Sequence, residues 1–152
     1  MSSIFTYGYG FSKNLCEDIT SRFLNTYLPR HNLVVNIIHR GMKREGVYGW
    51  CDISTERMSR PRKFMIELQS NMPRDLYIST LFHELIHVKQ WVRGELSFRA
   101  GKMLYDGENV SQWDYDKQPH EVEAHSKEKV LTKIYKRMTV EDLAHYPPVL
   151  LD

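Results

Sequence analysis

The fold of this chain is decided by the stretch DLYISTLFHELIHVKQWVR, residues 75–93. Most of these residues favour helices, and Gly94 follows as a typical residue beyond a helix end. Residues 71–75, NMPRD, supply a capping residue, an early proline and an acid for the first turn. Apolar residues lie nearly all round the predicted helix, which indicates that it is buried. One broad apolar face carries Tyr77, Ile78, Leu81, Leu85, Val88 and Val92, and Leu76, Phe82, Ile86 and Trp91 flank it.

Two histidines lie four residues apart inside this helix, His83 and His87, and Glu84 directly follows the first. Positions i and i+4 share a helix face, so both imidazoles can point at one metal ion. Glu84 lies about 100° round the helix, where it can act as a general base on a water molecule. The alternative is a pair of surface histidines, but the apolar surroundings predict burial, and buried histidines need partners or a metal. This HExxH pattern therefore predicts a zinc site.

Composition and charge are those of an ordinary globular protein. At 152 residues we expect one domain over residues 1–152, and the formal charge of +2 gives no strong attraction to nucleic acid or a membrane surface. The N-terminus lacks a basic region followed by an apolar core, and no apolar run approaches about 18 residues, so we expect neither a secretory leader nor a membrane span. Cys16 and Cys51 lack CxxC spacing and cannot build a zinc ribbon. We expect reduced thiols and a cytoplasmic protein.

Two further helices are predicted. Residues 12–28 have apolar side chains at every fourth position, Ser12 as a cap and Pro29 beyond the end. Residues 119–138 have proline at the first helical position and acids in the first turn. Residues 139–142 have the form of a capping box and would open a short final turn.

Three strands are predicted between the first two helices. Residues 32–39 and 63–69 are apolar runs typical of strands, and residues 47–54 are expected to pair with the first run as a hairpin. Residues 96–113 read as loop, with room for a short strand or a helical turn. The order of elements predicts an α+β domain: a short three-stranded or slightly larger sheet packed on the helix of residues 75–93, with a second ligand-bearing helix after it.

Basic residues gather in the two loops that flank the second predicted strand. No aromatic residues or nucleic-acid motif accompany them, so we interpret them as solvated loop charges rather than as a nucleic-acid site. They are Arg40, Lys43 and Arg44 in the first loop and Arg57, Arg60, Arg62 and Lys63 in the second.

The third metal ligand must come from elsewhere, since a catalytic zinc has three protein ligands and a water. Candidates cluster near the start of the helix of residues 119–138. Glu121 shares a polar strip with His125 and Glu128, whereas Glu123 flanks the other side of the same apolar stripe. Periodicity leaves both glutamates open and favours Glu121 slightly, because its strip holds a second group able to support a metal.

HExxH followed by a downstream helix with Glu-x-x-Ala resembles the gluzincin class of zinc peptidases, particularly its minimal single-domain members. It is also similar to small metallopeptidases predicted in bacteriophage genomes, which share a Pro-x-Glu-x-Glu-Ala segment. The resemblance implies a zincin-like fold and Glu121 as the third ligand, with Ala124 three and His125 four residues further on. The latter position is usually Asp, which orients a zinc-bound histidine. The resemblance further implies that residues 63–69 form the sheet edge that binds substrate backbone.

The SprT-like peptidases, which act on proteins bound to DNA, also carry HExxH. They use a third histidine and usually add a cysteine zinc ribbon, which this chain cannot form. In that comparison His120 or His125 would replace Glu121 as the third ligand.

The leading hypothesis is peptide-bond hydrolysis on a protein or peptide substrate. Zinc held by His83, His87 and Glu121 would activate a water, and Glu84 would act as general base. A hydrogen-bond donor should stabilise the oxyanion. The candidates for that donor are Tyr105, Tyr115, His120 and His125.

Two alternatives keep the fold without free activity. One is a zinc-containing binding or structural module, although structural sites favour four ligands rich in cysteine. The other is a latent peptidase whose apolar tail, residues 146–152, fills the cleft, although simple packing of that tail is favoured. The oligomeric state and the identity of the substrate are left open.

Overall fold

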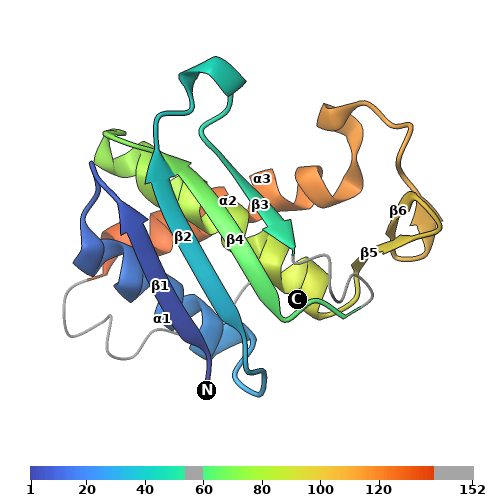
Figure 1. The fold of residues 1–152 in the computed structure, drawn as a ribbon, viewed down its shortest axis with the longest axis horizontal. Coiled ribbons are helices and arrows are strands. Elements are labelled where there is room, and N and C mark those ends of the chain that lie inside the picture. Colours follow the sequence, from blue (N-terminus) through green and yellow to red (C-terminus); the bar gives the residue numbers. More distant parts are fainter. Residues whose placement is uncertain (54–59, 139–152) are drawn as a thin grey trace.

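The first half of the chain forms a four-stranded mixed sheet in the computed structural model, which describes residues 1–53 and 60–138 (Figure 1). The strand order is β1-β2-β4-β3, with β1, β2 and β4 parallel and β3 antiparallel to β4. The strands are β1 (Ser3–Gly8), β2 (Val34–Arg40), β3 (Gly49–Ile53) and β4 (Lys63–Gln69).

The helix α1 (Lys13–Tyr27) forms the crossover between the parallel strands β1 and β2, as such a connection requires. The prediction for this helix is confirmed, and so is its cap, because the Ser12 hydroxyl accepts a hydrogen bond of 3.3 Å from the Leu15 backbone N–H. Apolar residues of α1, including Ile19 and Phe23, are buried against the sheet and its neighbouring helices.

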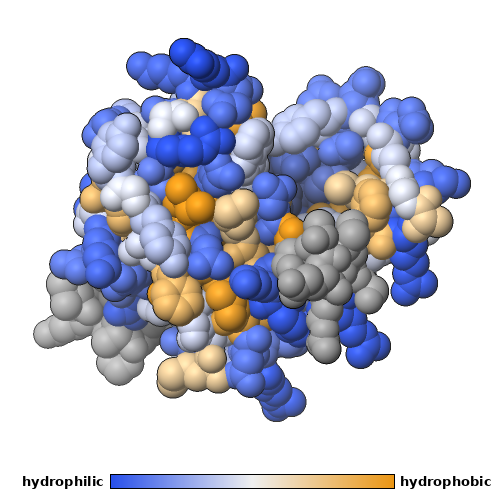
Figure 2. All heavy atoms as spheres, in the orientation of Figure 1, coloured by the Kyte–Doolittle hydropathy of each residue, from blue (hydrophilic) through white to orange (hydrophobic). Residues whose placement is uncertain are grey.

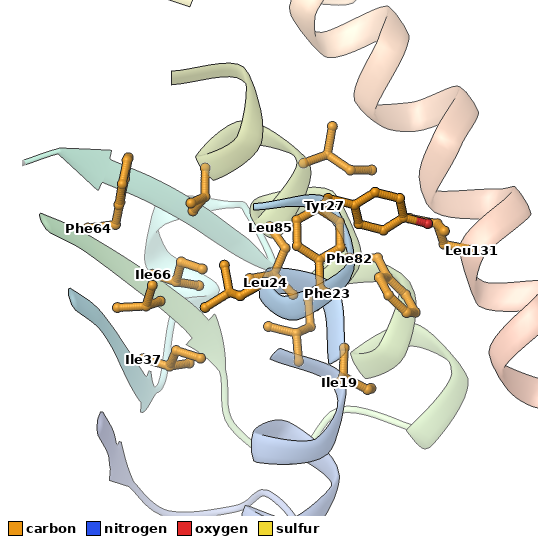
Figure 3. Close-up of a cluster of buried hydrophobic side chains, with 14 of the residues drawn as sticks. Ile19, Phe23, Leu24, Tyr27, Ile37, Phe64, Ile66, Phe82, Leu85 and Leu131 are labelled. Carbon is orange, nitrogen blue, oxygen red and sulfur yellow. The ribbon is translucent and has the colours of Figure 1, made fainter. Parts of the chain in front are cut away.

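Alternation along β2 and β4 sends one set of side chains into the core. Val35 and Ile37 on β2, and Phe64, Ile66 and Leu68 on β4, are fully or almost fully buried. Figure 3 shows Ile37, Phe64 and Ile66 pointing from the strands toward apolar side chains of the helices. The core thus lies between one face of the sheet and the helices.

The helix α2 (Arg74–Val92) is the central element, in contact with the sheet, with α1 and with α3 (Pro119–Arg137). Figure 1 shows α2 and α3 behind the sheet. Every residue from 80 to 92 is buried, which explains why the sequence is apolar all round. The predicted bounds of α2 and α3 are each within one residue of those observed.

The start of α2 differs from the prediction. Pro73 occupies the capping position and offers no side-chain hydrogen bond, so Asn71 is not the cap. Asn71 instead adopts a left-handed conformation (φ 61°) in the turn after β4, which asparagine tolerates better than most residues. Asp75 lies in the first turn and Gly94 beyond the last, as predicted.

Three predictions about the sheet were wrong. The strand β1 was missed, because it is an edge strand whose face toward the helices is only half-buried, and it therefore lacks a strong apolar alternation. Strand β3 does not form a hairpin with β2 but pairs with β4, which lies between them. Strand β4 is consequently interior, and β3 is the edge strand beside α2. Proximity in sequence could not decide this pairing, because β3 follows β2 and precedes β4 across connections of similar length.

The outward face of the sheet mixes apolar and polar side chains (Figure 2). Phe5, Tyr7, Trp50 and Met65 are exposed on it. Arg40, which was predicted in a loop but is the last residue of β2, lies beside Trp50 and pairs with both Glu45 and Glu67, so local acids neutralise its charge.

Residues predicted mainly as loop form a second small sheet instead. It consists of β5 (Leu96–Arg99), β6 (Lys102–Tyr105) and β7 (Glu108–Asn109). Both of its turns place two consecutive residues at positive φ, Ala100-Gly101 and Asp106-Gly107, as the tightest hairpins require. A short helical turn, η3 (Tyr115–Lys117), then leads into α3.

Several expectations lie outside the described residues: Arg57 of the second basic loop, the capping box of residues 139–142 and the tail of residues 146–152. Within the described ranges, no helix combines the length and apolarity needed to cross a membrane.

Both cysteines are free thiols, as predicted, and both are poor nucleophiles. Burial raises the pKa of Cys16 to about 11 and raises that of Cys51 well above its usual value. A raised pKa keeps a thiol protonated and unreactive at neutral pH. We therefore expect neither thiol to react within minutes with a chromogenic disulfide reagent in the folded protein, and both to react after unfolding in guanidinium. Rapid labelling of the native protein would contradict this assignment.

Candidate metal centre

Helix α2 brings His83 and His87 together on the side that faces α3. Their rings lie edge to face with centroids 4.7 Å apart, and their Nε2 atoms lie 3.2 Å apart. Both side chains are buried, with 7% of each residue exposed. The four-residue spacing therefore places two imidazole nitrogens at one point in the interior.

Glu121, in the first turn of α3, supplies a carboxylate at the same point. Its Oε1 lies 2.9 Å from His83 Nε2 and 3.3 Å from His87 Nε2. A tetrahedral metal ion with bonds of about 2.0–2.2 Å separates its donor atoms by roughly 3.3–3.6 Å. The three observed separations come within a few tenths of an ångström of that range. The donor set therefore fits a metal ion, and this buried cluster can hold one.

The charges in the cluster depend on one another. Burial opposes ionisation of His83, but the neighbouring carboxylates of Glu121 and Glu128 outweigh it and raise the pKa of His83 to about 10. Burial also opposes ionisation of Glu121, but His83 and His87 hold the pKa of this carboxyl well below its usual range. A divalent cation can replace the histidine protons as the partner of the carboxylate.

Glu84 is buried beside these donors but is not part of the triangle. Burial raises the pKa of Glu84 to about 7, although His87 and His83 act in the opposite direction. Its Oε2 has no hydrogen-bond partner among the described residues. A buried carboxylate oxygen without a partner is costly, and such groups are found where function requires them.

A cavity of about 420 Å³ opens next to Glu84 and His83. It lies between the start of β3, the first half of α2, η3 and the middle of α3. Its lining residues are Val47, Tyr48, Gly49, Leu76, Ser79, Thr80, His83, Glu84, Tyr115, His125, Glu128 and Lys129.

The four candidate oxyanion donors are placed differently. Tyr115 lines the cavity, and its hydroxyl donates a hydrogen bond of 2.9 Å to Glu121 Oε1. Tyr105 donates instead to Glu123, at 3.1 Å. His120 is buried, and its Nε2 lies 3.8 Å from Glu121 Oε2.

His125 occupies the position where the gluzincin resemblance expects an acid. Its exposed ring lies 4.5 Å from that of His83, and its Nδ1 is 2.8 Å from Glu128 Oε1. Glu128 Oε1 in turn lies 3.4 Å from His83 Nδ1. The acid nearest His83 Nδ1 is therefore Glu128, one turn further along α3 than the position that the resemblance indicates. His83, His125 and Glu128 also form a second group of potential metal donors, which shares His83 with the first.

Glu123, the alternative third ligand, belongs to a different network. Its Oε1 accepts a hydrogen bond of 3.0 Å from Gln90 Nε2, and its Oε2 accepts the one from Tyr105. Gln90 was missed by the sequence reasoning. The clue was available, because a glutamine one turn after His87 in a helix that is apolar all round must find buried partners.

No protein-family model matches this chain, and neither a curated protein nor a solved structure is significantly similar to it. The resemblance to gluzincins therefore rests on the residues already named.

We expect Glu121, and not Glu123, to be required for metal binding. Losing a residue that only supports a metal ligand typically weakens metal binding by about 10–100-fold. Glu121→Ala removes a ligand itself and should weaken the binding of Zn²⁺ or Co²⁺ by more than that. Glu123→Gln should stay within a few-fold of the parent protein, because its amide oxygen can still accept from Gln90 or Tyr105. Competition with a chromogenic chelator measures both affinities. Equal losses in the two variants would contradict the geometry.

Proposed function

We propose that this protein is a zinc-dependent peptidase whose metal is held by His83, His87 and Glu121. One observation carries the proposal: three donors converge beside a buried carboxylate, Glu84, at a cavity large enough to hold a side chain. Two imidazoles and one carboxylate form a common donor set of catalytic zinc sites. When bound there, zinc acts as a Lewis acid that polarises the substrate carbonyl and lowers the pKa of a water molecule.

Glu84 acts as the general base. It takes a proton from the attacking water as the water oxygen bonds to the carbonyl carbon, and it returns this proton to the amine as the C–N bond breaks. The free Oε2 of Glu84 and its place on the cavity wall support this role. Tyr115 is the best placed of the four candidates to stabilise the oxyanion, because its hydroxyl contacts the Glu121 carboxylate and the residue also lines the cavity.

The substrate backbone binds along β3, and not along β4 as first expected. Tyr48 O accepts the Gln69 backbone N–H, so by the alternation of an antiparallel pair the backbone groups of Gly49 and Cys51 face the edge of β3 that pairs with no other strand among the described residues. A Cβ added at Gly49 would come within 2.9 Å of Leu68 Cδ2, 3.0 Å of the Glu67 carbonyl oxygen and 3.1 Å of Thr80 Cγ2, so glycine lets β3 pack closely on both β4 and α2 here. A peptide that adds a strand here passes beside Glu84.

A purely structural metal site is the main rival. Such sites are closed by a fourth protein ligand and need no base. The described residues contribute three donors, and Glu84 faces a cavity rather than a partner. The third donor being a glutamate also favours a gluzincin-like site over a SprT-like one.

Glu84→Gln tests the catalytic assignment. The amide cannot accept the proton, so peptide hydrolysis should fall by about 10²–10⁴-fold. Zinc content should be unchanged, because Glu84 is not a ligand. Digestion of a peptide library, analysed by mass spectrometry with and without a chelator, measures the activity. Glu17→Gln, at a partly exposed position of α1, is the matched control. Full activity in Glu84→Gln, or a parent protein without chelator-sensitive cleavage, would refute the proposal.

A further inference from the structure

Gln90 is the most deeply buried polar side chain near the candidate metal centre. It contacts Nδ1 of His87, the ring nitrogen that does not face His83 and Glu121. The residue has no exposed surface, and its Oε1 lies 2.7 Å from His87 Nδ1. It projects from α2 one turn beyond His87, toward the start of α3. A glutamine in such a position must have each of its polar groups matched.

The neighbouring groups allow the side-chain amide of Gln90 only one orientation. The Nε2 atom lies 3.0 Å from the His120 backbone carbonyl and 3.0 Å from Glu123 Oε1. A carbonyl oxygen accepts only, and an ionised carboxylate also accepts only. Burial opposes ionisation of Glu123, but Gln90 and Lys127 lower its pKa below the usual value, so the acceptor role holds. Both amide hydrogens are therefore used, and the oxygen must face His87.

The orientation of the amide decides the tautomer of His87. The Gln90 oxygen can only accept, so Nδ1 of His87 must carry the proton and donate it. The lone pair of a neutral His87 is then on Nε2, which is the atom that faces His83 Nε2 and Glu121. An imidazole in the other tautomer would present N–H to the metal position.

We propose that Gln90 is a positioning residue that holds the His87 ring with its Nε2 lone pair toward the metal and ties this ring to the residue before Glu121. The tie is the bond to the His120 carbonyl, which precedes the third donor directly in the chain. One side chain thus orients the second ligand and locates the third. This inference rests on the proposed metal site.

A buried amide between two helices also stabilises their packing, so the test must separate positioning from stability. Gln90→Met keeps a side chain of similar length without a hydrogen bond to His87. Gln90→Asn keeps the amide, but its side chain is one methylene shorter, so the amide oxygen lies farther from His87. We expect each variant to bind Zn²⁺ about 10–100-fold more weakly than the parent, as for other outer partners of metal-bound histidines.

Zinc affinity is measured by chelator competition on protein shown to be folded by circular dichroism. The visible spectrum of the Co²⁺-loaded protein gives a second reading, because it reports ligand geometry. Ile37→Val, a buried position on β2 in the sheet, is the control for lost stability and should change neither reading. If Gln90→Met does not fold, Gln90→Asn decides.

The outcomes separate this inference from the proposed function. Affinity and cobalt spectrum within twofold of the parent in the folded Gln90 variants would overturn the positioning role while leaving the metal site intact. A parent protein that binds neither zinc nor cobalt would overturn both.

Discussion

The structure depends on one constraint: polar groups sit on a helix that is buried on every side. From residue 80 to residue 92 helix α2 has no exposed residue, yet this stretch includes His83, Glu84 and His87. An unsatisfied buried polar group costs about 1–3 kcal/mol, and a whole domain is stable by only about 5–15 kcal/mol. The face of α2 that carries the imidazoles must therefore meet a complementary element. Helix α3 fills that requirement by presenting Glu121 to both histidines.

The chain between the two helices builds the support for that meeting. The small second sheet carries Tyr105 to Glu123, and the turn η3 carries Tyr115 to Glu121. Gln90 then links Glu123 and the His120 carbonyl to His87. Each of these contacts falls in or beside the first turn of α3, so the position of Glu121 is fixed from several directions. A donor held by its neighbours keeps its geometry whether or not a cation is present.

Helices were easier to predict than pairings. The bounds of α2 and α3 could be read from periodicity and end residues because those signals are local. The pairing of β3 with β4 could not, since nothing in residues 47–54 distinguishes one neighbouring strand from another. Similarly, HExxH predicted three residues of the candidate site, but helical periodicity could not separate Glu121 from Glu123, which border the same apolar stripe. The choice depends on how α3 is rotated against α2, and that rotation is set by tertiary contacts such as Gln90 to Glu123. The second sheet escaped prediction because its strands are only two to four residues long.

Buried side-chain atoms without a hydrogen-bond partner are concentrated at the candidate site. Within the described residues, six buried side-chain atoms have no hydrogen-bond partner, and three of them belong to His83, Glu84 and His120. Proteins rarely tolerate such atoms, and here half of them gather in one place. Among these three residues, His83 and Glu84 also line the cavity. Toward Gln90, the Nδ1 of His87 and both oxygens of Glu123 are paired, and the unpaired atom on this side is Nδ1 of His120. The contacts of His87 Nδ1 and of Glu123 are therefore complete, whereas Glu84, on the cavity wall, has an oxygen without a partner among the described residues. Water or substrate entering the cavity can supply the hydrogen bond that this oxygen of Glu84 lacks.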